Sequence, residues 1–153
     1  MSAVPQPRVQ YQSMRETDLV PVTAIEESIY EFPWTRGNFL DSLHAGYTCW
    51  LCQDTHGLVG YAVLMNVPDE VHLLNLSIAG HLQRRGHGAR MLEFLIDNAR
   101  SAKLRRMILE VRPSNDGGRR LYANFGFREA GIRRDYYPAA AGREDALVLA
   151  LDL

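Results

Sequence analysis

The sequence lacks long hydrophobic runs and an excess of charge of either sign. No apolar run reaches the roughly 20 residues that a helix needs to cross a bilayer, and residues 1–10 lack the basic and apolar regions of a signal peptide. The 17 basic and 18 acidic residues give a formal net charge of -1, so no overall positive field attracts nucleic acid or an anionic membrane. These absences predict a cytoplasmic protein with no membrane partner and no direct nucleic-acid partner.

Cysteine is also nearly absent. The two cysteines, Cys49 and Cys52, have the C-x-x-C spacing of redox pairs and of zinc half-sites. A structural zinc site needs four ligands, and the sequence has neither a second cysteine pair nor an H-x-x-x-H group. The run Tyr47 to Cys52 favours a strand, whereas a thioredoxin-type pair begins a helix. We therefore expect two ordinary thiols on a strand, and no metal site.

The composition that remains is that of one compact domain. Hydrophobic residues make up 46% and charged residues 23% of 153 residues, which fits a single core and leaves no room for a second domain. Residues 1–10 contain prolines and little pattern. We predict a flexible N-terminal tail over 1–10, one domain over 11–153, and a monomer.

Hydrophobic periodicity changes several times along the chain. Apolar residues at spacings of three and four, such as Leu19, Val22 and Ile25, predict a helix that Pro33 ends. A long helix is predicted from Gln83 to near residue 101 by the same criterion. The other predicted helices cover 34–45 and 115–124, and the predicted strands cover 9–14, 47–52, 58–66, 71–78, 106–112, 127–132 and 146–151.

The strands at 71–78 and 106–112 flank the long helix, and this arrangement predicts a crossover between two parallel neighbours. The other strands follow one another through short turns, which favours antiparallel pairing. The fold class is therefore α/β, with a single mixed, mostly antiparallel sheet, helices on both faces and a central parallel strand pair.

Gly86 and Gly88 lie between the strand that ends near Ile78 and the long helix. Glycines let the backbone approach an anion closely, and the N–H groups and dipole of a helix start attract negative charge. Arg84 and Arg85 add two positive charges. An ordinary glycine-containing loop is the alternative, while a Rossmann dinucleotide site is disfavoured because the third glycine of G-x-G-x-x-G is absent.

Glu110 and Tyr122 form the second candidate group. In an alternating strand, Glu110 lies on the face opposite Leu109 and Val111, which places a carboxylate near the middle of the sheet. The ordinary alternatives are a partly exposed glutamate paired with an arginine, and a core tyrosine with its hydroxyl at the surface.

These two groups carry a family resemblance. The run Q-R-R-G-H-G-A at 83–89 resembles the acetyl-coenzyme A motif of the GNAT superfamily of N-acetyltransferases, and residues 110–127 resemble its pattern E-x-x-x-x-N-x-x-x-x-x-x-Y-x-x-x-G-F. Within the superfamily, the chain is similar to the bacterial ribosomal-protein alanine acetyltransferases from about Tyr11 to Leu153. The runs R-R-D-Y-Y-P at 133–138 and G-R-E-D-A at 142–146 are typical of that group.

The resemblance implies that acetyl-coenzyme A is the co-substrate and that no metal takes part. It implies that Glu110 is the general base, Tyr122 the general acid, and the N-terminal alanine of a small-subunit ribosomal protein the acceptor, which attacks directly. The residues it implies for coenzyme binding are Leu76, Ser77, Ile78, Arg84, Arg85, Gly86, His87, Gly88, Ala89 and Asn115. The residues it implies for acceptor binding are Trp34, Asp135, Tyr136 and Tyr137.

Two other functions stay open at this point. One is an acetyltransferase that acts on other protein N-termini or on a small amine, and the other is a non-catalytic coenzyme A-binding module. Asp135, with Glu144 and Asp145, would attract a basic residue after the acceptor's first alanine, whereas ordinary solvated charges are the alternative. Gly117 and Gly118 predict a late or frayed start of the helix that carries Tyr122.

Overall fold

A computed structural model describes residues 8–153. The predicted tail lies outside the described residues up to residue 7, and Gln10 already begins the first strand. Within the described part, no helix is long and apolar enough to cross a membrane.

Seven strands form one sheet in the order β1-β2-β3-β4-β5-β7-β6. The β4–β5 pair is parallel and the other neighbours are antiparallel, which confirms the predicted mixed sheet with a central parallel pair. The strands are β1 (Gln10–Ser13), β2 (Thr48–Asp54), β3 (Gly57–Val67), β4 (Glu70–Ile78), β5 (Arg106–Val111), β6 (Arg128–Ala139) and β7 (Gly142–Asp152).

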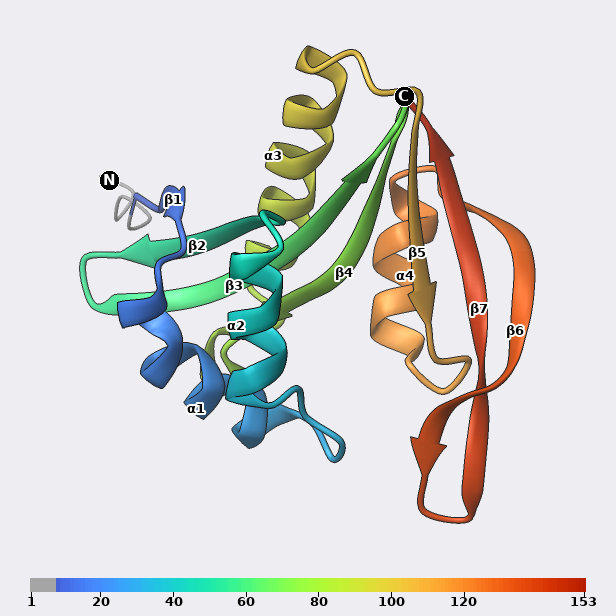
Figure 1. Ribbon diagram of the computed structural model, residues 1–153, viewed down its shortest axis with the longest axis horizontal. Coiled ribbons are helices and arrows are strands. Elements are labelled where there is room, and N and C mark those ends of the chain that lie inside the picture. The colour runs from blue at the N-terminus through green and yellow to red at the C-terminus, as the bar shows by residue number, and fades with distance from the viewer. Residues whose placement is uncertain (1–7) are drawn as a thin grey trace, which may run out of the picture.

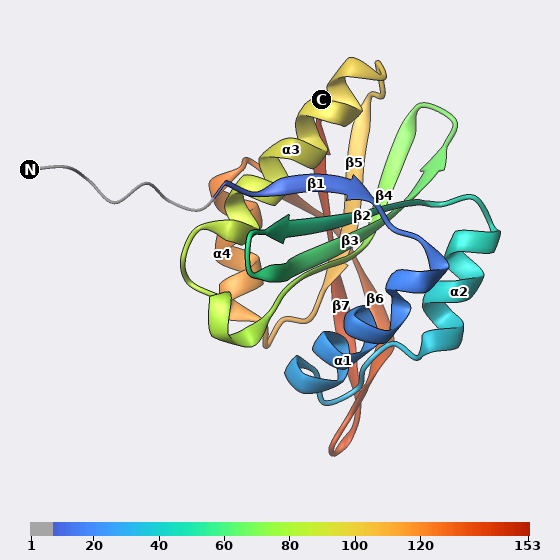
Figure 2. The same cartoon turned by 90° about the vertical axis from the view of Figure 1, so that its left-hand side faces the viewer.

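Helices cover both faces of the sheet, as predicted (Figure 1 and Figure 2). One face carries α1 (Leu19–Ile29) and α2 (Arg36–His44), and its core includes Val22, Phe39 and Tyr61. The other face carries α3 (His87–Ser101) and α4 (Asp116–Asn124), and its core includes Met91 and Leu95. The sheet is therefore the shared middle layer of two cores.

β4 and β5 are paired over only part of their length. Residues 70–73 of β4 pair with residues 106–109 of β5, whereas β4 continues to Ile78 and β5 to Val111. A register shift between β3 and β4 leaves Leu74 unmatched at this point. Figure 1 shows the two strands diverging toward their carboxyl ends. Within residues 8–153, no strand pairs with the β5 side of β4 from residue 74 to 78.

The predicted end of the first helix at Pro33 is wrong. α1 ends at Ile29, and Tyr30 has an extended conformation with φ -119° and ψ 139°. The extended chain after Tyr30 brings the Trp34 N–H within 2.9 Å of the Glu26 carboxylate. This tertiary hydrogen bond replaces another turn of helix.

The last two strands are longer than the predicted 127–132 and 146–151. β6 continues to Ala139, and β7 already begins at Gly142. The pairing of the two strands resumes after a register shift between Arg133 and Tyr137, within which Asp135 has a φ of 51°. Nearly all of β6 is exposed, so hydrophobic alternation does not mark its length in the sequence.

The predicted late start of α4 is also wrong, since α4 begins at Asp116. The Asn115 side-chain oxygen accepts a hydrogen bond of 2.9 Å from the Gly118 N–H and caps the helix. A Cβ at residue 118 would lie 2.6 Å from Asn115 Nδ2. Gly118 therefore makes room for the cap that starts the helix, which offsets part of the cost of glycine.

Candidate active site

The glycine loop ends in a helix start with the geometry that an anion requires. Gly86 is the N-cap of α3 with φ 85°, and Arg84 has φ 62°. An alanine Cβ at residue 86 would lie 2.9 Å from Arg90 Nη1, and Arg90 also reaches the Arg85 carbonyl and His87 Nδ1. Burial, followed by the nearby Arg90, lowers the pKa of His87. The first turn of α3, whose N–H groups have no partner within the helix, thus lies beside the Arg90 guanidinium.

Gly88 connects this loop to the other predicted coenzyme residues. A Cβ at residue 88 would lie 3.8 Å from Leu121 Cδ2 on α4 and 3.9 Å from Ile78 Cγ1 at the end of β4. Ala89 follows in the first turn of α3. The loop therefore lies close to both the end of β4 and the helix that carries Tyr122.

The end of β4 offers backbone groups rather than side chains. Ser77 is buried and its hydroxyl is hydrogen-bonded to the Tyr30 hydroxyl and to the Asn75 side-chain oxygen, both at 2.6 Å. The Gln83 amide donates to the Ile78 carbonyl at 3.0 Å. Leu76 and its two successors lie where β4 has left β5, so this edge can accept an extended chain.

Glu110 is the first β5 residue beyond the pairing with β4, and its side chain is 6% exposed. One oxygen, Oε2, contacts Nε2 of His72. Arg133 Nε lies 3.4 Å from the other oxygen, Oε1, without the alignment of a hydrogen bond. Oε1 is buried and has no hydrogen-bond partner among residues 8–153.

Tyr137 and Tyr122 both have raised pKa values. Burial and then the Glu110 carboxylate raise the pKa of Tyr137. Burial and then the hydroxyls of Tyr30 and Tyr137 raise the pKa of Tyr122 above its ordinary 10. The Tyr122 ring packs edge-on against Phe127 at 5.5 Å between centroids. Tyr122 therefore keeps its proton at neutral pH.

Arg112 contacts both the β6–β7 hairpin and the segment after α1. Arg112 lies 4.4 Å from the Tyr137 ring and 5.6 Å from the Phe32 ring. Its guanidinium donates to the Pro138 carbonyl at 2.9 Å and to Glu144 at 3.1 Å. One arginine therefore fixes the hairpin relative to the segment after α1 that carries Phe32.

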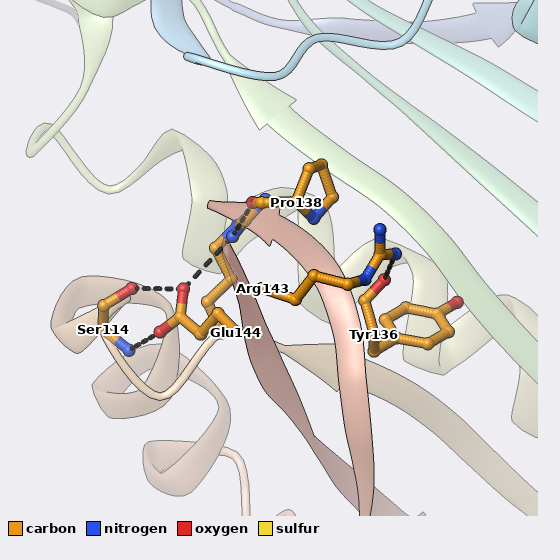
Figure 3. Close-up of polar contacts among 6 residues, drawn as sticks. Ser114, Tyr136, Pro138, Arg143 and Glu144 are labelled. Atoms are coloured by element: carbon orange, nitrogen blue, oxygen red, sulfur yellow. Dashed lines mark hydrogen bonds and ion pairs between the residues drawn. The ribbon is translucent and has the colours of Figure 1, made fainter. Parts of the chain in front are cut away.

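Two of the hairpin acids already have hydrogen-bond partners within the protein, and Figure 3 shows those of Glu144. Glu144 accepts hydrogen bonds from the Ser114 N–H at 3.1 Å and from the Ser114 hydroxyl at 3.0 Å. Asp145 accepts from the Asp135 N–H and from Arg134. Their expected pairing with a basic acceptor residue would compete with these bonds, whereas the Asp135 side chain is exposed.

The predicted acceptor aromatics are only partly at the surface. Tyr136 is 41% exposed and Phe32 is 40% exposed, and Tyr136 also contacts Tyr137 at 4.8 Å between centroids. Trp34 packs against Phe39 in the core at 5.1 Å between centroids. Trp34 therefore anchors the segment between α1 and α2 to the core, and Phe32 is the exposed aromatic residue of that segment.

Sequence reasoning missed His72, Tyr30, Arg90 and Arg112 as neighbours of the site. His72, Tyr30 and Arg112 are remote in sequence from their partners, as for His72 and Glu110, which are 38 residues apart. Knowledge of the β4–β5 register was needed to place that pair on one face. Arg90 lies three residues after His87 in α3, and this helical spacing could have indicated it.

The two cysteines lie in β2 as predicted, one facing each core. Both are free and buried, and burial raises the pKa of each thiol to about 11. A thiol with such a pKa is a poor nucleophile at neutral pH. Within the described residues, no group of three or more His, Cys, Asp or Glu could hold a metal ion.

Comparison with known proteins decides the family. The model of the Acetyltransferase (GNAT) family matches residues 14–127. The chain belongs to the GNAT acetyltransferase family. The [ribosomal protein bS18]-alanine N-acetyltransferase of Escherichia coli K12 is 36% identical to this GNAT acetyltransferase over 141 residues, 92% of this chain and 95% of the relative.

Other relatives of this GNAT acetyltransferase agree. The enzyme of the same name from Haemophilus ducreyi is 30% identical over 143 residues, 93% of this chain and 99% of the relative. The crystal structure of the Escherichia coli ribosomal-protein-S18-alanine N-acetyltransferase superimposes with a TM-score of 0.89 at 35% identity, over 95% of this chain and 94% of that one. Ard1 from Thermoplasma volcanium shares the fold, with a TM-score of 0.84 at 19% identity over 95% of this chain and 97% of that one.

Proposed function

We propose that this enzyme transfers an acetyl group from acetyl-coenzyme A to the N-terminal alanine of a ribosomal protein, by direct attack of the α-amine. The relatives that match nearly the whole chain carry that activity in their names. The observation that carries the mechanism is the buried Glu110 Oε1, which has no hydrogen-bond partner among residues 8–153. It is an acceptor available to a substrate N–H.

The coenzyme site would combine three elements. The N–H groups at the start of α3, with Arg84 and Arg85, would hold the pyrophosphate. The unpaired edge of β4 at residues 76–78 would pair with the pantetheine arm, and Asn115, besides capping α4, would contact the coenzyme from the α4 side. The position of Gly88 supports this arrangement, because a Cβ there would already be in van der Waals contact with Ile78 and Leu121, so the three elements lie close together.

The chain's own residues would move the protons. A peptide α-amine has an ordinary pKa of about 7.7–8.0, so roughly a tenth is neutral at pH 7 and needs only modest help. Glu110 Oε1 would accept the amine proton as the N–H bond breaks. When bound, acetyl-coenzyme A supplies a thioester carbonyl that the amine attacks, and a backbone N–H near Ile78 would stabilise the oxyanion.

Tyr122 would serve the leaving sulfur. Its raised pKa keeps the hydroxyl protonated, as a general acid must be before the reaction. Between ordinary values, proton transfer to a thiolate costs about 2 kcal/mol, and burial of Tyr122 makes full transfer costlier. Tyr122 would therefore act mainly by donating a hydrogen bond to the departing thiolate.

Peptide acetylation tests the proposal. A peptide that begins with alanine and arginine and carries an internal lysine is incubated with acetyl-coenzyme A, and mass spectrometry locates the acetyl group. We expect label on the α-amine, and we expect Glu110→Gln to lower kcat by about 10²–10⁴-fold with unchanged coenzyme affinity. The exposed Glu129→Gln is the control.

Three results would reject the proposal in part or whole. Label on the lysine side chain, or faster turnover of a small amine, would favour a different acceptor. Coenzyme binding without transfer to any amine would indicate a binding module. Unchanged turnover in Glu110→Gln would remove Glu110 as the base.

A further inference from the structure

His72 on β4 contacts the candidate base, although no motif includes it. Its Nε2 is bonded to Glu110 Oε2, and the two side chains are 19% and 6% exposed. The parallel register places His72 opposite Ile108, two residues before Glu110 and on the same face of the sheet. The contact therefore spans the end of the β4–β5 pairing, between a paired residue of β4 and the first unpaired residue of β5.

Few charged side chains among residues 8–153 surround the contact between His72 and Glu110. From β6, Arg133 lies 3.4 Å from Glu110 Oε1 and is 56% exposed. Burial, followed by the Glu110 charge, raises the pKa of Tyr137. Glu70 and Arg106, on the same two strands, pair with each other at 3.9 Å. The partners on β3 and β7, Met65 and Val148, carry no charge.

We infer that His72 is a positioning residue for Glu110; this rests on the proposed function. The imidazole donates its Nε2–H to Oε2, which holds the carboxylate so that Oε1 faces the acceptor amine. During the reaction an amine N–H bond breaks and an O–H bond forms at Oε1, while the imidazole N–H stays in place.

The choice of variants tests the hydrogen bond itself. The side-chain amide introduced by His72→Gln still offers an N–H to Oε2, so we expect kcat at pH 8 to stay within about 5-fold of wild type, while His72→Leu loses about 10-fold or more. The affinity for acetyl-coenzyme A should be the same in all variants. His56→Gln, which changes an exposed histidine in the β2–β3 turn, is the matched control and should keep the wild-type kcat.

A spectroscopic readout distinguishes failure of this inference from failure of the proposed function. A low-field imidazole N–H proton signal should appear in the NMR spectrum of the wild type and of His56→Gln, and disappear in His72→Gln and Glu110→Gln. Wild-type kcat in His72→Leu, or acetyl transfer without this signal, would overturn the role of His72. The signal without transfer to any amine would overturn the proposed function and, with it, the role of His72 in the reaction, although the contact with Glu110 would remain.

Discussion

Glu110 shows how a single residue is set apart by its backbone position. The main chain of Glu110 is still paired with Val148 of β7, whereas β4 no longer pairs with the other side of β5 at this residue. Burying a carboxylate is costly unless its oxygens are bonded, and here one oxygen is bonded to His72 while the other has no partner among residues 8–153. A buried hydrogen-bond acceptor without a partner is more typical of a functional site than of a stable core.

Tyr122→Phe tests the proposed acid. The ring would keep its packing against Phe127, so we expect the free energy of unfolding to change by less than about 1 kcal/mol. Loss of the hydroxyl should lower kcat by about 10–100-fold, without weakening coenzyme binding. Steady-state kinetics check this, with Tyr47→Phe as the control; equal kcat values in the two variants would exclude Tyr122 as the acid.

Gly86→Ala tests the phosphate loop. Residue 86 has φ 85°, and the new Cβ would lie 2.9 Å from Arg90 Nη1, so the loop or the arginine must move. We expect the affinity for acetyl-coenzyme A to fall by about 10-fold or more by calorimetry. Gly117→Ala, whose Cβ would meet nothing within 4 Å, should bind normally; equal affinities would argue against a phosphate site here.

At the scale of elements, one buried carboxylate joins α1 to the sheet. Glu26 is 2% exposed. It accepts hydrogen bonds from the Tyr61 hydroxyl at 2.8 Å, the Asn75 amide at 3.0 Å and the Trp34 N–H at 2.9 Å. These partners come from β3, β4 and the segment before α2. The network thus fixes the segment between α1 and α2, which carries Phe32, relative to the edge of β4.

Glu26→Gln should weaken this hydrogen-bond network. The amide can accept fewer of the three donors and brings a donor of its own, so we expect the free energy of unfolding to fall by about 1–3 kcal/mol. Chemical denaturation measures the loss. Glu27→Gln, on the exposed side of the same helix, should change it by less than about 0.5 kcal/mol, and a similar small change in Glu26→Gln would show that the network contributes little.

At the scale of the molecule, the sheet separates two cores that solvent does not reach. Cys49 belongs to the core beneath α1 and α2, and Cys52 to the core beneath α3. Because burial disfavours the charged thiolate, the pKa of each thiol rises to about 11. The two thiols therefore report independently on the two faces of the sheet.

Thiol labelling makes this measurable. At pH 8 only about a thousandth of each thiol would be ionised, so iodoacetamide should modify neither in the folded protein, and the small rate should rise with pH. Both should react in denaturant. Mass spectrometry after partial denaturation tells whether Cys49 and Cys52 become reactive together, as one cooperative unit requires. Rapid labelling of either thiol in the folded state would contradict its burial.

The sequence by itself determined the elements whose physics is local. The apolar stripe of α3 and the alternation of the central strands predicted the sheet, its parallel pair and the helices on both faces. The glycine loop, Glu110 and Tyr122 were singled out from residue type and spacing, together with the family resemblance. Local signals failed at the end of α1, in the exposed β6 and at Gly118, where a tertiary hydrogen bond, a register shift and a side-chain cap decided the outcome.

Only the tertiary structure decided which distant residues meet. The register of β4 against β5 brings His72 to Glu110, and the end of that pairing at residues 73 and 109 opens the edge of β4. The pairing of Glu144 and Asp145 within the hairpin likewise depends on how β6 and β7 align. Strand register depends on packing across the whole sheet, because a shift by one residue turns every side chain to the other face. Residue spacing along one strand carries no information about its neighbour's register, so these contacts follow from the fold alone.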